Sequence, residues 1–140
     1  MITAFTVNTV EGGIESIDSL SKQGFPKINV NLEEVKEDSE EIAIKFSFVA
    51  EYFDIESASS KVGTIKITGN VKVKPEDNTV DNAIKNWNEK HMLPTKIAEE
   101  VINGLNFRCS ATGTLVAYSL GLIPPLSISQ VKIKEAPAAS

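Results

Sequence analysis

Apolar and polar side chains alternate through most of the first 75 residues. The pattern is clearest at residues 42–53, where one face is aliphatic or aromatic and the other is mostly polar. Stretches with the same period lie at residues 4–8, 28–35 and 65–74. A period of two is typical of a β-strand with one buried face. The pattern therefore predicts four antiparallel strands, of which the last three form a meander.

Two interruptions are expected within these strands. Gly12 and Gly13 permit positive φ, so we expect the first strand to end there in a turn or bulge. Glu33 and Glu34 shift the phase of the second strand, as a β-bulge would. Residues 14–27 are too irregular for a strand and too apolar for an ordinary loop. They indicate a connection that crosses the structure and packs against another element.

The period becomes helical after the fourth strand. Thr79 can cap a short helix with an apolar side over residues 80–87. Pro94 suits the first turn of a second helix, because its missing N–H would be unpaired there in any case. Apolar residues then recur at helical spacing over about residues 95–120. At the usual rise this helix would be roughly 40 Å long, more than one small sheet is expected to cover.

Small side chains populate the middle of this long helix. They would let another backbone or a second subunit approach closely, although two glycines weaken a helix that lacks such packing. A break near Gly113, giving a kinked helix pair, is the alternative to one continuous helix. The candidates for helix or oligomer packing are Gly104, Cys109, Ala111, Gly113 and Ala117.

The helix is followed by a rigid extended segment. Gly121 is a typical helix stop, and Pro124 and Pro125 prevent the helix from continuing. A short extended stretch is expected from Leu126 to residue 133, and the small-residue tail at 135–140 is expected to be flexible. We thus predict an α+β fold in which a four-stranded antiparallel sheet is followed by a long helix, or a kinked pair, on one face. Residues 1–134 would form its single domain.

Composition narrows the classes of function. The chain has 140 residues, of which 41% are hydrophobic and 24% charged, as in an ordinary soluble globular domain. Its formal net charge of −5 disfavours nucleic acid or an anionic membrane as the main partner. Neither a membrane-spanning run nor a signal peptide is recognisable. One cysteine cannot form an internal disulfide, which fits a cytoplasmic protein.

Candidate chemistry is sparse. His91 and Cys109 are the only residues of their types, so N and S ligands cannot assemble a zinc site, and no cofactor or catalytic motif is recognisable. We therefore expect a protein that is not an enzyme and binds no metal. The acidic turn at 36–41 lacks the glycine and ligand order of a calcium loop. It is either a solvated turn or a docking surface for a basic partner, through Glu37, Asp38, Glu40 and Glu41.

Taken in order, the elements resemble those of the SecB export-chaperone family. The resemblance rests on "FTVNTVEGG" at the first strand, "IESIDSLSKQGFPK" at the crossover connection and "INVNLEEVKEDSEEIAIKFSFVAEYF" at the acidic hairpin. "HMLPTKIAEEVI" resembles the family's entrance to the main helix, and "GLIPPLSISQVKI" resembles its Pro-Pro-Leu segment. Three features depart from the family. Its Asn-Phe-Asp-Ala-Leu-Tyr ending is absent, since Gln130-Val131-Lys132-Ile133 is followed by a small-residue tail. The main helical region is about ten residues longer, and the C-terminal basic metal-binding tail that contacts the SecA motor is missing.

This resemblance implies an ATP-independent holdase, assembled as a dimer of dimers, that binds unfolded or pre-export polypeptides in apolar grooves. The groove would lie between the crossover segment and the end of the main helix, with simple core packing as the alternative for each residue. Its candidate residues are Ile17, Leu20, Phe25, Ile28, Leu120, Leu122, Ile123 and Leu126. The open strand face with Lys45, Ser47 and Glu51, and the acidic turn, would face a motor or toxin partner.

Two other classes of function stay open. The first is a dedicated partner-binding adaptor or a toxin-antitoxin-associated chaperone without a general export role. The second is an enzyme or small-ligand pocket, which would require titratable groups that converge in a cavity.

Overall fold

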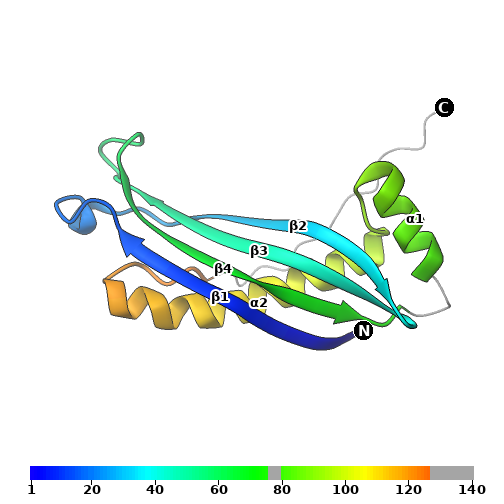
Figure 1. Cartoon of the computed structure of the whole chain (residues 1–140). Coiled ribbons are helices and arrows are strands. Elements are labelled where there is room, and N and C mark those ends of the chain that lie inside the picture. Colours follow the sequence, from blue (N-terminus) through cyan, green and yellow to red (C-terminus); the bar gives the residue numbers. More distant parts are fainter. Residues whose placement is uncertain (76–79, 127–140) are drawn as a thin grey trace.

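The computed structural model describes residues 1–75 and 80–126, which form a four-stranded sheet with helices (Figure 1). The strands are β1 (Ile2–Ile14), β2 (Lys27–Asp38), β3 (Glu41–Phe53) and β4 (Lys61–Val73). A single 3₁₀ turn, η1 (Leu20–Lys22), interrupts the connection between β1 and β2. The helices are α1 (Val80–Lys90) and α2 (Thr95–Leu120). The predicted α+β class is confirmed.

All neighbouring strands are antiparallel, in the order β1-β4-β3-β2. The predicted meander of β2, β3 and β4 is confirmed, and so is the bulge in β2, which lies between Leu32 and Glu34. The expected break at Gly12 and Gly13 is wrong, because β1 continues through both glycines to Ile14. A Cβ on Gly12 would stand only 2.7 Å from Val116 Cγ1. Gly12 therefore lets α2 approach the sheet closely, and it does not form a turn.

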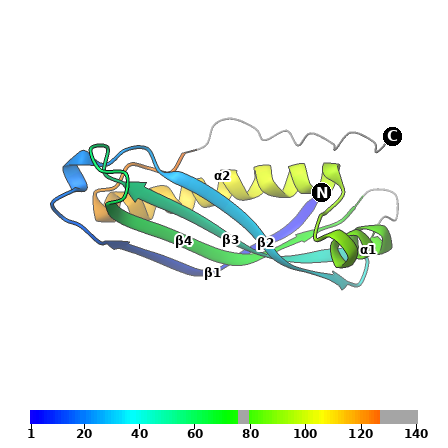
Figure 2. The same ribbon diagram turned by 90° about the horizontal axis from the view of Figure 1, so that it is seen from above.

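Helix α2 covers one face of the sheet along its length (Figure 2). It runs without a break from Thr95 to Leu120, so the predicted bounds are confirmed and the alternative of a kink at Gly113 is wrong. The expectation that this helix outreaches the sheet is also wrong, because β1, β3 and β4 each have 13 residues. At about 3.3 Å per residue such strands span roughly 40 Å, which matches the helix.

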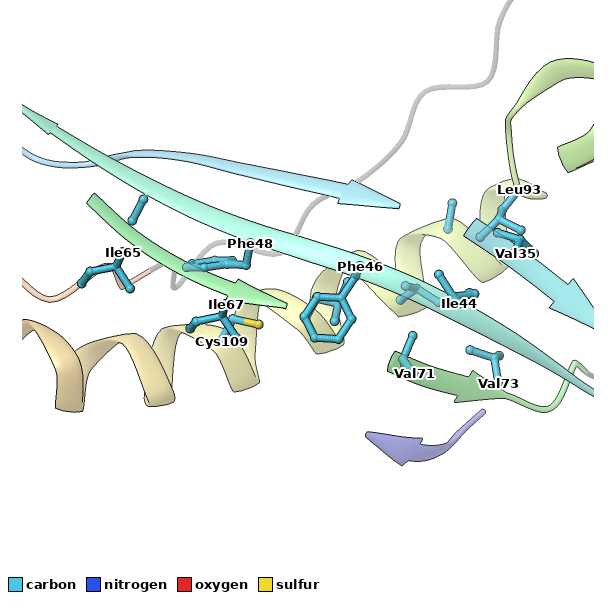
Figure 3. Packing of buried hydrophobic residues seen from close by; sticks show 14 of the residues in the cluster. Val35, Ile44, Phe46, Phe48, Ile65, Ile67, Val71, Val73, Leu93 and Cys109 are labelled. Atoms are coloured by element: carbon cyan, nitrogen blue, oxygen red, sulfur yellow. The ribbon is translucent and has the colours of Figure 1, made fainter. Parts of the chain in front are cut away.

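The core lies between α2 and the inner face of the sheet (Figure 3). Alternate residues of β3 and β4 point into it, among them Phe46, Phe48 and Ile67, which are fully buried. Cys109 points from α2 toward the sheet in the same layer (Figure 3). The opposite face of the sheet is covered by no described element and carries the exposed Lys45. This arrangement explains the clear alternation along β3.

The two ends of the molecule differ. At one end, α1 packs against β2 and β3, and the start of β1 is tied to α2 by a hydrogen bond from Ile2 N–H to Glu100 Oε1 (2.8 Å). At the other end, the crossover connection, the β3–β4 hairpin and the C-terminal end of α2 come together (Figure 1). Thr79, the extended stretch after Leu126 and the tail at 135–140 lie outside the described residues.

Candidate functional site

The end where the crossover connection meets the hairpin and the end of α2 is called the junction below. It comprises residues 15–26, 54–60 and 121–126. Short backbone contacts join the crossover connection to the β3–β4 hairpin: Gly24 N–H donates to the Phe53 carbonyl (3.0 Å), and Ile55 N–H donates to the Lys22 carbonyl (2.8 Å). Gln23 also forms an isolated antiparallel bridge with Asp54. The crossover connection is therefore a fixed part of the fold.

The side chain of Gln23 joins the crossover connection to the segment after α2. Its Nε2 donates to the carbonyls of Leu20 and Gly121, each at 2.9 Å. Its Oε1 accepts the N–H of Ile123 at 2.7 Å. One carboxamide thus holds backbone atoms that are about a hundred residues apart in the sequence.

Tyr52 fixes the same segment from the core side. Its ring is buried, and its hydroxyl donates to the Ile123 carbonyl at 2.6 Å. Burial raises the pKa of Tyr52 to about 12, so the phenol stays protonated and keeps this bond at neutral pH. Pro125 completes the contact, because a Cβ on Gly113 would stand 2.7 Å from its Cγ. The segment after the helix is therefore packed directly against α2.

Asp54 anchors the hairpin side of the junction. Its carboxylate accepts the Glu56 N–H at 2.8 Å, and it also bonds the buried Ser19 of the crossover connection. The bond from the Glu56 backbone, followed by the one from Ser19, lowers the pKa of Asp54 below its ordinary value. An ion pair between Lys22 and Glu56 (3.0 Å) adds a second, exposed link. The carboxylate is charged at neutral pH and serves as an acceptor.

Large apolar side chains nevertheless project from this braced junction. Phe25 is 88% exposed, Ile17 81% and Ile55 71%. Ile55 lies beside the crossover connection, since a Cβ on Gly24 would be 3.1 Å from its Cγ2. Ile55 was not among the predicted residues, because it is the one large apolar residue in a polar hairpin loop. Exposed apolar groups on a rigid frame are typical of a binding surface.

The other predicted groove residues, except Leu126, lie deeper. Leu122 is buried in the core, whereas Leu126 is exposed at the end of the described chain. Leu20 lies beside Gly121 at the C-terminal end of α2, since a Cβ on Gly121 would be 3.5 Å from its Cδ2. Three more are partly buried against the core: Ile28, Leu120 and Ile123. Leu120 faces β1, whereas Ile28 lies on β2, so these two lie at opposite edges of the sheet.

The predicted packing residues of α2 divide between its two faces. Cys109, Gly113 and Ala117 are buried toward the sheet, and Gly104 stands against Ile2 of β1. Only Ala111 of this set is exposed.

Helix α2 also carries apolar side chains on its outward face. Phe107 is 78% exposed, Leu115 72% and Tyr118 77%. Together with Ala111 they form the outer stripe, at positions 107, 111, 115 and 118, whose spacings of three and four residues place them on one side of a helix. A helix that is apolar on both sides is usually buried on both sides.

The acidic turn lies at the opposite end of the molecule from the junction. Asp38 pairs with Lys72 at 2.8 Å, and Glu41 accepts a hydrogen bond from Thr3. Glu37 and Glu40 line a shallow depression of about 260 Å³ together with Lys74. Two of the four carboxylates, those of Asp38 and Glu41, thus have bonding partners within the same chain.

Other candidate chemistry is isolated. His91 is exposed at the end of α1, and burial raises the pKa of the Cys109 thiol to about 12. Within residues 1–75 and 80–126, no three His, Cys, Asp or Glu side chains stand close enough to hold a metal ion. Over the same ranges, neither helix combines the length and apolar character that a bilayer crossing requires.

The fold is that of a SecB-like chaperone. The chain superposes on the Mycobacterium tuberculosis Rv1957 SecB-like chaperone, solved in complex with a ChAD peptide from the Rv1956 HigA1 antitoxin, with a TM-score of 0.55. The match covers 98% of this chain and 91% of that one, at 12% sequence identity. No family model and no curated protein matches the sequence. The resemblance found in the order of sequence elements is thereby confirmed at the level of fold.

Proposed function

We propose that this protein is a SecB-like, ATP-independent holdase that binds unfolded or precursor polypeptides at the junction. The observation that carries the proposal is the exposure of Phe25, Ile17 and Ile55 on a frame that is braced by Tyr52 and Asp54. Rigid apolar anchors lower the ordering cost of binding. No catalytic step is needed for this function, and Cys109 is too deeply buried to act as a nucleophile. The proposed location is the cytoplasm, where a single thiol stays reduced.

A dedicated partner-binding role is the second candidate. It is favoured by the antitoxin peptide bound to the similar Mycobacterium tuberculosis chaperone. A general holdase would bind several unrelated unfolded proteins with comparable affinity. A dedicated chaperone would bind one partner, such as an antitoxin segment or a transport motor, and would ignore the model clients. The exposed Glu37 and Glu40 of the acidic turn are the proposed contacts for a basic partner.

Self-association would supply multivalency to either role. The outer stripe at 107, 111, 115 and 118 can pair with its copy on a second α2, with Ala111 at the crossing point, where a small side chain lets the helices approach. Because each subunit also needs its junction exposed, pairing through α2 leaves the client surface free. We propose that this contact contributes to a homo-oligomer, and the expected form is a dimer of dimers.

Aggregation suppression tests the function. The protein is mixed with a chemically unfolded model client, without nucleotide, and light scattering is followed. The wild type is expected to suppress scattering, and Phe25→Ser is expected to suppress it several-fold less. Met92→Ser is the matched control, because Met92 is exposed and lies away from the junction, between α1 and α2. Equal activity of the three proteins would refute the assignment of the site, and an inactive wild type would refute the holdase.

A further inference from the structure

In the segment after α2, two backbone groups are bonded by one and the same side-chain amide. Gly121 N–H and Leu122 N–H both point to the Ala117 carbonyl, and the Ile123 carbonyl accepts the Tyr52 hydroxyl. The Gly121 carbonyl and the Ile123 N–H instead converge on the carboxamide of Gln23 (2.9 and 2.7 Å). These two groups lie on either side of Leu122. In a β-ladder, the carbonyl before a residue and the N–H after it bond a neighbouring strand in the same way.

The carboxamide of Gln23 has the same chemistry as a peptide group. It offers one N–H to the Gly121 carbonyl and one carbonyl to the Ile123 N–H, which are the bonds that an extended chain beside Leu122 would form. Leu122 is buried in the core, so this short edge is held in place. Pro124 and Pro125 follow and have no N–H groups, which limits the edge to this one pair.

We propose that the Gly121 carbonyl and the Ile123 N–H form a docking edge for the backbone of an extended polypeptide, and that the Gln23 side chain occupies this edge when no polypeptide is bound. The proposal rests on the holdase function and assigns the client's main chain a contact at the same site. Backbone bonding of this kind is independent of the client's sequence, and the exposed Phe25, two residues from Gln23, would contact its side chains.

Exchange of Gln23 for a client is feasible because the bond to the Gly121 carbonyl is exposed to solvent. The client replaces two of the three bonds of the carboxamide, and water can satisfy the released side chain. Removal of the side-chain amide should therefore favour the client by the net value of about one hydrogen bond, which corresponds to roughly fivefold in affinity.

The test is fluorescence anisotropy with a labelled, unstructured peptide, compared with a depsipeptide of the same side chains whose alternate N–H groups are replaced by ester oxygens. Gln23→Ala is expected to bind the ordinary peptide roughly fivefold more tightly than wild type, and to show no such gain for the depsipeptide. Ser21→Ala, an exposed neighbour in the same turn, is the matched control and should leave both affinities unchanged.

A second variant keeps the proposal testable if Gln23→Ala loses its structure. Gln23→Glu keeps the acceptor for Ile123 N–H but cannot donate to the carbonyls of Gly121 or Leu20, so it frees only half of the edge and should give a smaller gain. Unchanged or weaker binding by this variant, with its melting temperature retained, would overturn the docking edge. A wild type that binds neither peptide would instead refute the holdase function itself.

Discussion

Gly113 sits where two opposing effects on the stability of α2 meet. Glycine in a helix costs about 1 kcal/mol relative to alanine, so Gly113→Ala would be stabilising in an isolated helix. In this protein the added Cβ would stand 2.7 Å from Pro125 Cγ and 3.9 Å from Ile67 Cδ1. Overpacking of this kind costs about 1–3 kcal/mol, because Pro125 is buried and rigid. The cost of overpacking should exceed the gain in helix propensity, so we expect Gly113→Ala to lower the free energy of unfolding by about 1 kcal/mol.

A double-mutant cycle measures the clash directly. Pro125→Ala removes Cγ and Cδ, so Gly113→Ala in that background should stabilise the protein by up to about 1 kcal/mol. Urea unfolding followed by circular dichroism gives the four free energies, at one protein concentration because self-association would shift them. Gly13→Ala is the control, since its Cβ meets no atom within 4 Å. The reasoning is refuted if Gly113→Ala stabilises both backgrounds equally.

Three further outcomes follow from the same contacts. Tyr52→Phe should lower the free energy of unfolding, measured in urea, by about 1–2 kcal/mol, because the Ile123 carbonyl loses its donor. The pKa of Tyr52 is raised to about 12 in the folded protein, so the wild type should lose stability as the pH rises above about 10. Tyr52→Phe should lack this loss. The pKa of Asp54 is lowered by its bonds, so its contribution is present above about pH 3.9 and is lost as pH falls below it; Asp54→Asn should flatten this acid limb of thermal unfolding. Leu115→Glu on the outer stripe should lower the native mass measured by light scattering, and an unchanged mass would argue against pairing through α2.

Sequence patterns predicted the fold well where a residue's environment repeats along one element. The strands of the meander have one buried and one open face, so their alternation is strong. Helix α2 was predicted with its observed bounds for the same reason. The pattern failed at Gly12, because its role depends on Val116 of a helix a hundred residues away. Local turn chemistry cannot distinguish a glycine needed for such an approach from one needed for a bend.

The junction was only partly predictable. Leu20, Phe25 and Ile123 were identified because apolar residues in a turn-rich segment stand out. Gln23 was missed, since its partners are backbone atoms of Leu20, Gly121 and Ile123, and a backbone atom leaves no mark in the sequence. Ile55 was missed because one apolar residue in a polar hairpin has no periodicity.

Bracing and exposure at the junction are two parts of one arrangement. A loop that exposed Phe25 and Ile17 without internal bonds would collapse onto its own apolar surface or lose affinity to the entropy of ordering. Here the hydroxyl of Tyr52 holds the segment after α2, and Asp54 ties the hairpin to the crossover connection through its bond to Ser19. The polar bonds therefore fix the frame, and the apolar side chains are left for a client. On this view the loss of Asp54 or Tyr52 should weaken client binding even though neither residue would touch the client, whereas the loss of Phe25 should weaken binding without changing the frame.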